Sequence, residues 1–385
     1  MNRRLASALL SVVLLAVACA PAASTPAPAA STAPAAPASA PASNPVPAAP
    51  TASAALKPEL PTTPVVDLKI GVLQLSNYAP FFIGQARGYF KQLGLNVELI
   101  PTGNIVEQLS SIAQGQIQVG ACAANVACYN ALNRRIEVQI VADSLSAGKT
   151  EKAAGGNALV VRKDLWDDGT IRTPKDLVGR TIYLIPGPGS GHHAATARWL
   201  QRNGVDPLSV EWGSLASFAD QLAALENRGI ELGVQTEPLL AAGIARGTHQ
   251  VMATIEDMDP AYQALYLVYW NGIEQMGPMV GERVMVAYLR GVRDFINAFE
   301  YGIDQDEVVD ILTKETFIKD PAVYRQIKYG WINPDGAPLR QTIEGYAELF
   351  RELGLINTPI DLSQAFNDKY TRFAVQYLGE YRPPR

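Results

Sequence analysis

The strongest constraint on the fold is a regular alternation of short apolar runs with amphipathic segments, which begins near residue 69. Residues 69–73 form an apolar run typical of a buried strand, and residues 80–93 carry apolar side chains at helical spacing. Residues 95–99 alternate as a strand, and residues 105–112 return to helical spacing. Strands that alternate with helices build a parallel sheet covered by helices, so the sequence predicts an α/β fold.

The alternation continues over residues 117–142, and a second set of strands and helices begins near residue 157. A later apolar strand at residues 265–270 is placed to return the chain to the first set, and the pattern from residue 278 onward is mostly helical. A body of this length suits two lobes. We therefore expect two lobes, each a sheet flanked by helices, with residues 65–155 and 265–385 in lobe 1 and residues 156–264 in an inserted lobe 2.

The N-terminus has the pattern of a secretory signal. Arg3 and Arg4 precede an apolar run over residues 5–17, which ends in small residues before Cys19. The run is too short to span a bilayer, so it predicts a cleaved signal peptide over residues 1–18. Cutting before Cys19 resembles the processing of a bacterial lipoprotein and predicts a lipid-anchored protein that faces the periplasm or exterior. The alternative is an ordinary A-x-A cut and a freely secreted protein.

Residues 19–64 have the composition of a tether. They consist almost entirely of Ala, Pro, Ser and Thr, with Lys57 and Glu59 as the only charges. Such a segment cannot bury enough apolar surface to offset its ordering entropy, so we expect it to be disordered. Proline favours an extended chain, which at about 3.1 Å per residue reaches roughly 140 Å. A tether to a membrane and a passive spacer both explain this composition.

The charges and cysteines exclude several classes of function. Arg3, Arg4, Lys57 and Glu59 are the only charges before residue 65, so the 32 basic and 37 acidic residues of the chain leave 29 and 36 in the body. This net acidity argues against a nucleic-acid partner. The cysteines and histidines lack the spacing of a metal site, so we expect no metal and no cofactor. The sequence favours separate buried thiols for the two body cysteines, Cys122 and Cys128, with a disulfide as the alternative.

Several motifs resemble a family of periplasmic-type substrate-binding proteins that serve bacterial ABC importers. The motifs are Tyr78-Ala79-Pro80-Phe81-Phe82-Ile83, Arg87-Gly88-Tyr89-Phe90, Thr173-Pro174-Lys175-Asp176-Leu177, Glu237-Pro238 and Asn333-Pro334-Asp335-Gly336. The resemblance covers nearly all of residues 67–370. It implies two α/β lobes that close on a ligand through a hinge, the type II periplasmic-binding-protein fold. It also implies a monomer whose partners are a permease and an ATPase subunit, and ligands such as nitrate, sulfonates, taurine, thiamine-pyrimidine precursors or riboflavin.

The candidate ligand site follows from the predicted strands, because ligands of open α/β sheets bind beyond the carboxyl ends of the strands. The loops at these ends carry amide, hydroxyl and aromatic side chains. The candidate ligand-binding residues are Gln74, Asn77, Tyr78, Phe81, Asn104 and Asn125 in lobe 1, and Ser190, His192 and Glu237 in lobe 2. For Tyr78 and Phe81 the alternative is packing of the first helix against the sheet.

The loops favour a heteroaromatic nutrient, such as a thiamine-pyrimidine precursor or riboflavin. Placed polar groups and aromatic walls suit a small planar ligand, and Glu237 is suited to accept hydrogen bonds from ring nitrogens or an exocyclic amine. A nitrate or sulfonate site would want Arg or Lys at these edges. The alternative is a sulfonate, taurine or nitrate, held by the glycine-rich turn at 187–191 with Ser190 and His192.

An enzyme and a solute sensor are the two alternatives to a transport protein. The same fold resembles a fungal enzyme that makes the thiamine pyrimidine with a pyridoxal cofactor, a histidine and a cysteine-rich motif. This chain has no run of cysteines and no nucleophile elbow, so we expect a binding protein and not an enzyme. The third function is a solute sensor, but no membrane or signalling segment follows the body.

Overall fold

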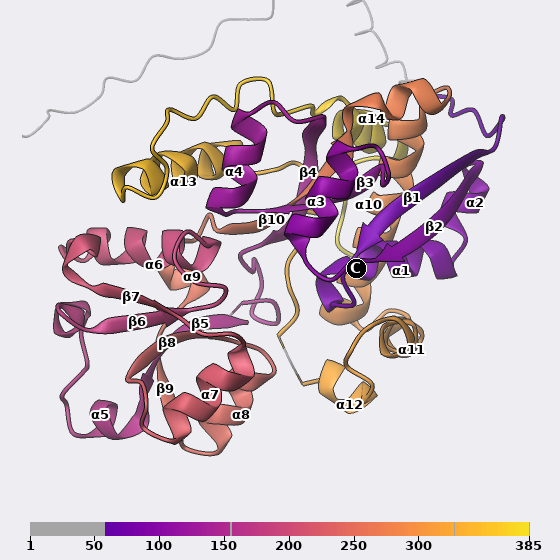
Figure 1. Cartoon of the computed structure of the whole chain (residues 1–385). Coiled ribbons are helices and arrows are strands. Elements are labelled where there is room, and N and C mark those ends of the chain that lie inside the picture. The colour runs from indigo at the N-terminus through magenta and orange to yellow at the C-terminus, as the bar shows by residue number, and fades with distance from the viewer. Residues whose placement is uncertain (1–57, 155, 327, 385) are drawn as a thin grey trace, which may run out of the picture. The chain divides into compact units, whose positions relative to one another are not determined.

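The computed structural model describes residues 58–154, 156–326 and 328–384 and contains two five-stranded sheets (Figure 1). The first sheet, in the order β2-β1-β3-β10-β4, consists of β1 (Val66–Val72), β2 (Leu95–Pro101), β3 (Val119–Ala123), β4 (Val138–Ser146) and β10 (Gln263–Trp270). The second, in the order β7-β6-β8-β5-β9, consists of β5 (Asn157–Arg162), β6 (Thr181–Leu184), β7 (Glu211–Ser214), β8 (Leu232–Thr236) and β9 (His249–Thr254). The predicted signal peptide, Cys19, most of the predicted tether and residue 155 lie outside the described residues.

Both sheets are mixed, whereas the sequence pattern predicted parallel sheets. In the first sheet β10 runs antiparallel to β3 and β4, and in the second β5 runs antiparallel to β8 and β9. The reversed strand in each case is the one on which the chain enters from the other sheet. The repeat of strands and helices predicted parallel pairing because it describes only connections within one sheet.

Helices cover the sheets and form most of the C-terminal region, as the sequence predicted. The helices are α1 (Ala79–Ala86), α2 (Tyr89–Gln92), α3 (Ile105–Ala113), α4 (Val126–Asn133), α5 (Lys163–Asp167), α6 (Gly191–Arg202), α7 (Phe218–Glu226), α8 (Leu239–Ala245), α9 (Ile255–Met258), α10 (Val280–Tyr301), α11 (Gln305–Glu315), α12 (Pro321–Tyr324), α13 (Arg340–Glu352) and α14 (Lys369–Leu378). The helix predicted over residues 80–93 is two helices, because Gly88 between them has a φ of 69°.

One apolar core lies against the first sheet and is organised by the long helix α10. Its side chains are buried along most of its length, and it packs against α1 and α14 (Figure 1). The buried guanidinium of Arg283 donates to the carbonyls of Pro64, Leu93 and Gly94, at 3.3, 3.2 and 3.4 Å. Leu60 packs against the same core. The described segment 58–64 is therefore held against the body by packing and hydrogen bonds.

A second apolar core continues from the first sheet into the second through α13. This core includes Ile140 of β4, Leu159 of β5 and Phe350 of α13. In the figure α13 lies beside α4, and it also packs on α6 (Figure 1). Arg198 of α6 and the Tyr346 hydroxyl both donate to one carboxylate oxygen of Asp259, at 2.9 and 2.7 Å. The C-terminal region therefore braces both sheets.

The buried carboxylate of Asp143 joins three segments that are distant in sequence. Its Oδ1 accepts hydrogen bonds from the Ser146 hydroxyl at 2.7 Å and from Gln263 Nε2 at 2.8 Å. Its Oδ2 accepts from the Asn333 backbone N–H at 2.7 Å, and its own N–H donates to the Gly336 carbonyl at 2.8 Å. Burial raises the pKa of Asp143 to about 6, against the lowering effect of these hydrogen bonds. This contact connects β4, β10 and the turn at 333–336.

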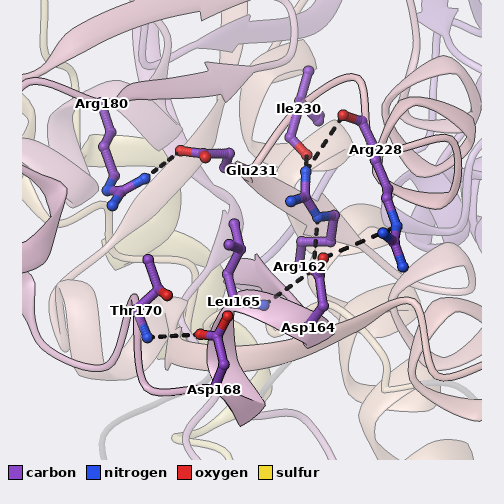
Figure 2. Close-up of polar contacts among 9 residues, drawn as sticks. All are labelled: Arg162, Asp164, Leu165, Asp168, Thr170, Arg180, Arg228, Ile230 and Glu231. Atoms are coloured by element: carbon purple, nitrogen blue, oxygen red, sulfur yellow. Dashed lines mark hydrogen bonds and ion pairs between the residues drawn. The ribbon is translucent and has the colours of Figure 1, made fainter.

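Pairs of opposite charges lie at the end of the second sheet where β5 terminates with Arg162 (Figure 2). Arg162 donates to Asp164 at 2.7 Å and to the Ile230 carbonyl at 3.2 Å. Arg180 donates to Glu231 at 2.6 Å. Partly exposed pairs of this kind contribute about 0.2–1 kcal/mol each, so they tie together strand ends and contribute little to the total stability.

His193 of α6 lies in the second core as a neutral imidazole. It is 2% exposed, and its ring centroid is 4.1 Å from that of Trp212 and 6.2 Å from that of Phe350. Its Nδ1 accepts a hydrogen bond from the Gly189 N–H at 2.9 Å. Its Nε2 has no hydrogen-bond partner among the described residues. A proton on Nδ1 would face the Gly189 N–H, which is also a donor. Burial lowers the pKa of His193 to about 4.

Replacing the shared acceptor at Asp143 is expected to weaken the whole body. Asp143→Ala leaves buried donors of three segments unpaired and should lower the free energy of unfolding by on the order of 3 kcal/mol. Chemical denaturation measures this loss. The control is Asp310→Ala, which removes an exposed carboxylate on α11 and should change stability by less than about 0.5 kcal/mol. Equal losses in the two variants would contradict the role given to Asp143.

The buried imidazole of His193 predicts a pH dependence of stability. Its pKa is about 4 in the folded protein and has an ordinary value of 6.5, so the unfolded chain binds the proton more readily between these values. The contribution to stability is complete above pH 6.5 and is lost as pH falls toward 4, up to about 3 kcal/mol. His193→Asn retains an acceptor for Gly189 and should flatten this part of the profile. Denaturation at several pH values tests it, and an unchanged slope in the variant would count against the assignment.

Candidate functional site

A cavity of about 670 Å³ lies at the carboxyl ends of strands from both sheets. Its wall includes residues that follow β1, β3, β6, β8 and β9, together with the last residues of β4. The same wall includes residues at the start of the reversed strands, among them Asn157 of β5 and Ala264 of β10. A reversed strand begins where its neighbours end, so all these segments meet at one edge. The volume lies in the range of small-molecule sites.

Backbone hydrogen bonds link segments that surround this cavity. The Val126 N–H, at the start of α4, donates to the Gly189 carbonyl in the glycine-rich turn at 3.0 Å. This bond joins the loop after β3 to the loop after β6. The Phe317 N–H donates to the Gln74 carbonyl at 3.0 Å and places the segment after α11 beside the loop after β1. The cavity is therefore bordered by the C-terminal region as well as by both sheets.

Six of the nine residues predicted from the sequence line the cavity. They are Gln74, Asn77, Asn125, Ser190, His192 and Glu237. Two of them are also helix caps: the Asn125 side chain accepts from the Cys128 N–H, and the Ser190 side chain accepts from the His193 N–H. Capping uses one lone pair of each oxygen and orients the side chain at the strand-to-helix loop.

The other three predicted residues lie elsewhere. Tyr78 and Phe81 are each 1% exposed; the Tyr78 hydroxyl donates to Gln108 Oε1 at 3.4 Å, and the Phe81 ring centroid is 5.0 Å from that of Tyr288. Asn104 is exposed and caps α3 by accepting from the Glu107 N–H. The rings predicted to stack on a ligand are thus core residues, because the first helix buries them against the sheet.

The aromatic wall of the cavity comes from residues that the sequence analysis did not select. They are Phe218, Tyr262, Phe317 and Tyr329. Tyr262 stands just before β10, and Phe317 and Tyr329 belong to the segment between α11 and α13. The sequence held no signal for Tyr262, because its place at this edge follows from the reversed direction of β10. The position of the C-terminal segment had no local signal.

Three charged residues line the cavity, and two of them are acidic. They are Glu237, Glu256 and Lys328. Glu237 accepts from the Ala241 N–H at 3.2 Å, and burial raises its pKa while that hydrogen bond and the Lys328 charge lower it. Glu256 accepts from the Gly148 N–H at 2.9 Å, and Lys328 Nζ donates to the Glu151 carbonyl at 2.6 Å. No arginine stands among the described lining residues.

His192 forms part of the wall with both ring nitrogens near protein partners. Nδ1 lies 3.3 Å from the Ile185 carbonyl, and Nε2 lies 3.2 Å from the side-chain oxygen of Asn157. Burial lowers the pKa of His192, so the ring is neutral near pH 7. Its ring is nearly parallel to Tyr262 at a centroid distance of 6.2 Å, with 9° between the planes. These contacts describe a packed wall.

The glycine-rich turn at 187–191 is used by the protein itself. The Gly189 N–H donates to His193 and its carbonyl accepts from Val126. Gly187 and Gly189 have φ values of 133° and 80°, which favour glycine. The turn therefore supports the cavity wall, and the Gly189 amide is not available to an anion.

Cys122 and Cys128 form a disulfide, with a Cα–Cα distance of 6.1 Å. The sequence had favoured separate thiols because one cysteine ends a strand and the other lies on the next helix. The short loop between β3 and α4 brings the two together. Within residues 58–154, 156–326 and 328–384 no group of His, Cys, Asp and Glu is arranged to hold a metal. In the same ranges no helix combines the length and apolar character needed to cross a bilayer.

Residues 75–298 match the family model described as NMT1/THI5 like, which is more than half of the chain. A comparison with curated protein sequences finds none that matches.

The fold is similar to that of several solved structures. The periplasmic aliphatic sulphonate binding protein SsuA from Escherichia coli has a TM-score of 0.62 and 15% identity, over 80% of this chain and 93% of that chain. The periplasmic nitrate-binding protein NrtA from Synechocystis PCC 6803 has a TM-score of 0.61 and 13% identity, over 82% of this chain and 89% of that chain. The Candida albicans CA3427 gene product, which exhibits the generic periplasmic binding protein structural fold, has a TM-score of 0.55 and 12% identity, over 79% of this chain and 96% of that chain.

These matches confirm the fold and the family that the sequence motifs predicted. At identities below 20% the solved structures show the shared fold alone, and the family model covers the strands and helices that build most of the cavity. The chain belongs to the NMT1/THI5-like family and has the periplasmic-binding-protein fold.

Proposed function

We propose that this protein is the extracytoplasmic solute-binding component of an ABC importer. It captures a small organic nutrient in the cavity between the two sheets and delivers it to a membrane permease. The observation that carries the proposal is the cavity itself, which both sheets line with amides, hydroxyls and rings. Sites of this composition bind small organic molecules by burying most of their surface. The family and the fold support the same class of function.

The ligand proposed here is a heteroaromatic compound, such as a thiamine-pyrimidine precursor or riboflavin. Phe218, Tyr262 and Tyr329 offer ring faces, and offset stacking contributes about 0.5–1.5 kcal/mol beyond the area buried. Glu237 and the amides of Asn77 and Asn125 are suited to accept or donate hydrogen bonds at the ring edge. Tyr78 and Phe81 do not enter this proposal, because they belong to the core.

A sulfonate, taurine or nitrate is the second candidate. Two structural neighbours are an aliphatic sulphonate binding protein and a nitrate-binding protein. In this chain Lys328 and the hydroxyl of Ser190 would have to hold the anion. Strong oxyanion sites use charged hydrogen bonds, above all from arginine, and the described lining residues include none. We therefore rank an anionic ligand below a heteroaromatic one.

Binding without catalysis is the activity we propose. A general base must direct a lone pair at the ligand, and both ring nitrogens of His192 are directed at protein oxygens, those of Ile185 and Asn157. An enzyme like the pyrimidine synthase, or a solute sensor, would use the same cavity differently. Incubation with ligand separates an enzyme from a binding protein, since a binding protein returns the compound chemically unchanged.

Export and anchoring complete the proposal. The disulfide between Cys122 and Cys128 fits an oxidising compartment. A signal peptide over residues 1–18, lipid on Cys19 and a tether would keep the binding body near its permease. The proposed protein is a monomer that works with permease and ATPase subunits.

A panel of compounds tests the ligand class by thermal shift. Pyrimidine precursors and riboflavin should raise the melting temperature because a ligand that binds the folded state stabilises it by mass action. Taurine, alkanesulfonates and nitrate should have little effect. Phe218→Ala should reduce affinity for the active compound by about tenfold, because it removes one half-buried ring of the wall.

The matched control is Phe373→Ala, which removes a half-buried ring on α14 that does not line the cavity. It should leave affinity unchanged. Stabilisation by taurine or nitrate alone would overturn the ligand class, and an equal loss in both variants would show that Phe218 acts only through stability.

The anchor predicts a covalent change at Cys19. Mass spectrometry of the membrane fraction should find the mature chain beginning at Cys19 with a diacylglycerol group attached. Cys19→Ala should release the protein into the soluble exported fraction while leaving its ligand binding intact. An unmodified Cys19 in soluble wild-type protein would refute the anchor without affecting the proposed binding function.

A further inference from the structure

The charges of the cavity narrow the ligand class further, and this step rests on the proposed binding function. We infer that the ligand carries a positive charge: it is an organic cation, a planar ring bearing a protonated or quaternary amine, with Glu237 as its counter-ion.

The two carboxylates of the cavity stand at the same edge of the second sheet. Ala158 of β5 pairs with Gln235 of β8 on one side and with Thr254 of β9 on the other. Glu237 and Glu256 each stand two positions beyond these partners, and both line the cavity. Because β5 runs in the opposite direction, the ends of β8 and β9 both lie beside its first residues. The two carboxylates therefore lie at the same edge of the sheet, on the wall of the cavity.

Glu237 has an oxygen available to a ligand. Its Oε2 accepts from the Ala241 N–H at 3.2 Å, and among the described residues no protein donor forms a hydrogen bond with Oε1. Burial raises the pKa of Glu237 and the nearby charge of Lys328 lowers it, while the Lys328 ammonium donates to the Glu151 carbonyl at 2.6 Å. No ion pair joins Lys328 to Glu237 in the described part of the chain.

Tyr262 adds a buried polar side chain to the wall of the cavity. It is 4% exposed, and its hydroxyl has no protein hydrogen-bond partner among the described residues. Burial and the charges of Asp259 and Glu256 raise its pKa, so the phenol stays neutral and its ring keeps a negative face. With Phe218 and Tyr329 on the same wall, the cavity offers aromatic faces and carboxylates together. Cations are bound by this combination through cation–π attraction and direct charge compensation.

The balance of charge favours a cation over a neutral or anionic ligand. The described wall carries two carboxylates and one ammonium, and His192 is neutral because burial lowers its pKa. A closed cavity around a neutral ring would keep the net negative charge of this wall away from water, which is costly. A sulfonate would add a further negative charge. An ammonium group near Glu237 would neutralise the net negative charge of the wall. It would also donate hydrogen bonds to the carboxylate in place of the water that the ligand displaces.

Three probes that share a benzene ring and differ in charge test the inference by calorimetry. They are benzyltrimethylammonium, benzyl alcohol and benzenesulfonate. We expect the ammonium to bind about tenfold more tightly than the alcohol and the sulfonate to bind most weakly. Glu237→Gln should weaken the ammonium by about tenfold and change the alcohol by less than twofold. The control is Glu211→Gln, which neutralises an exposed carboxylate on β7 and should change neither.

A second variant keeps the test decisive if Glu237→Gln folds poorly. Lys328→Met removes the one ammonium of the described wall and should strengthen the cation by about threefold while weakening the sulfonate. A preference for benzenesulfonate, or an ammonium affinity that neither variant changes, overturns the inference. Equal binding of alcohol and ammonium also overturns it but leaves the proposed binding function standing. If no probe binds and no heteroaromatic compound of the thermal-shift panel stabilises the protein, both fail.

Discussion

One strand in each sheet, β5 or β10, runs antiparallel to both of its neighbours. Because β5 and β10 enter their sheets from the other one, each begins at the edge where its neighbours end. The cavity, its two carboxylates and most of its polar wall lie along these meeting points. Two sheets with only parallel strands would place the connecting segments at the opposite edge. The two passages of the chain between the sheets, from β4 to β5 and from β9 to β10, therefore bring the walls of the site together.

Buried polar contacts then hold the segments that cross between the sheets. Asp143 connects β4, β10 and the turn at 333–336, and Asp259 connects α6 to α13. Each carboxylate accepts hydrogen bonds from groups far apart in sequence, so each is costly to bury and strongly specifies one arrangement. The apolar core that spans both sheets supplies the bulk of the stability, whereas these contacts determine its geometry.

Much of the candidate site was predictable because it follows from local signals. Asn125 and Ser190 are caps at strand-to-helix loops, and Gln74 and Glu237 stand within two residues of the ends of β1 and β8. The prediction was wrong in placing the rings of Tyr78 and Phe81 at the ligand, because an aromatic residue after a strand is equally suited to packing the next helix. Tyr262 and Tyr329 were missed since their neighbours in space are remote in sequence.

Local patterns were enough to predict the elements, their caps, the family and the edge of each sheet that lines the cavity, because periodicity, capping and turn residues act over a few positions. It also determined that the body carries excess negative charge. The direction of β5 and β10, the pairing of Cys122 with Cys128 and the composition of the aromatic wall became clear only in the folded structure. These depend on contacts between segments tens to hundreds of residues apart or on the path of a loop, and their free energy comes from burial that no local pattern records.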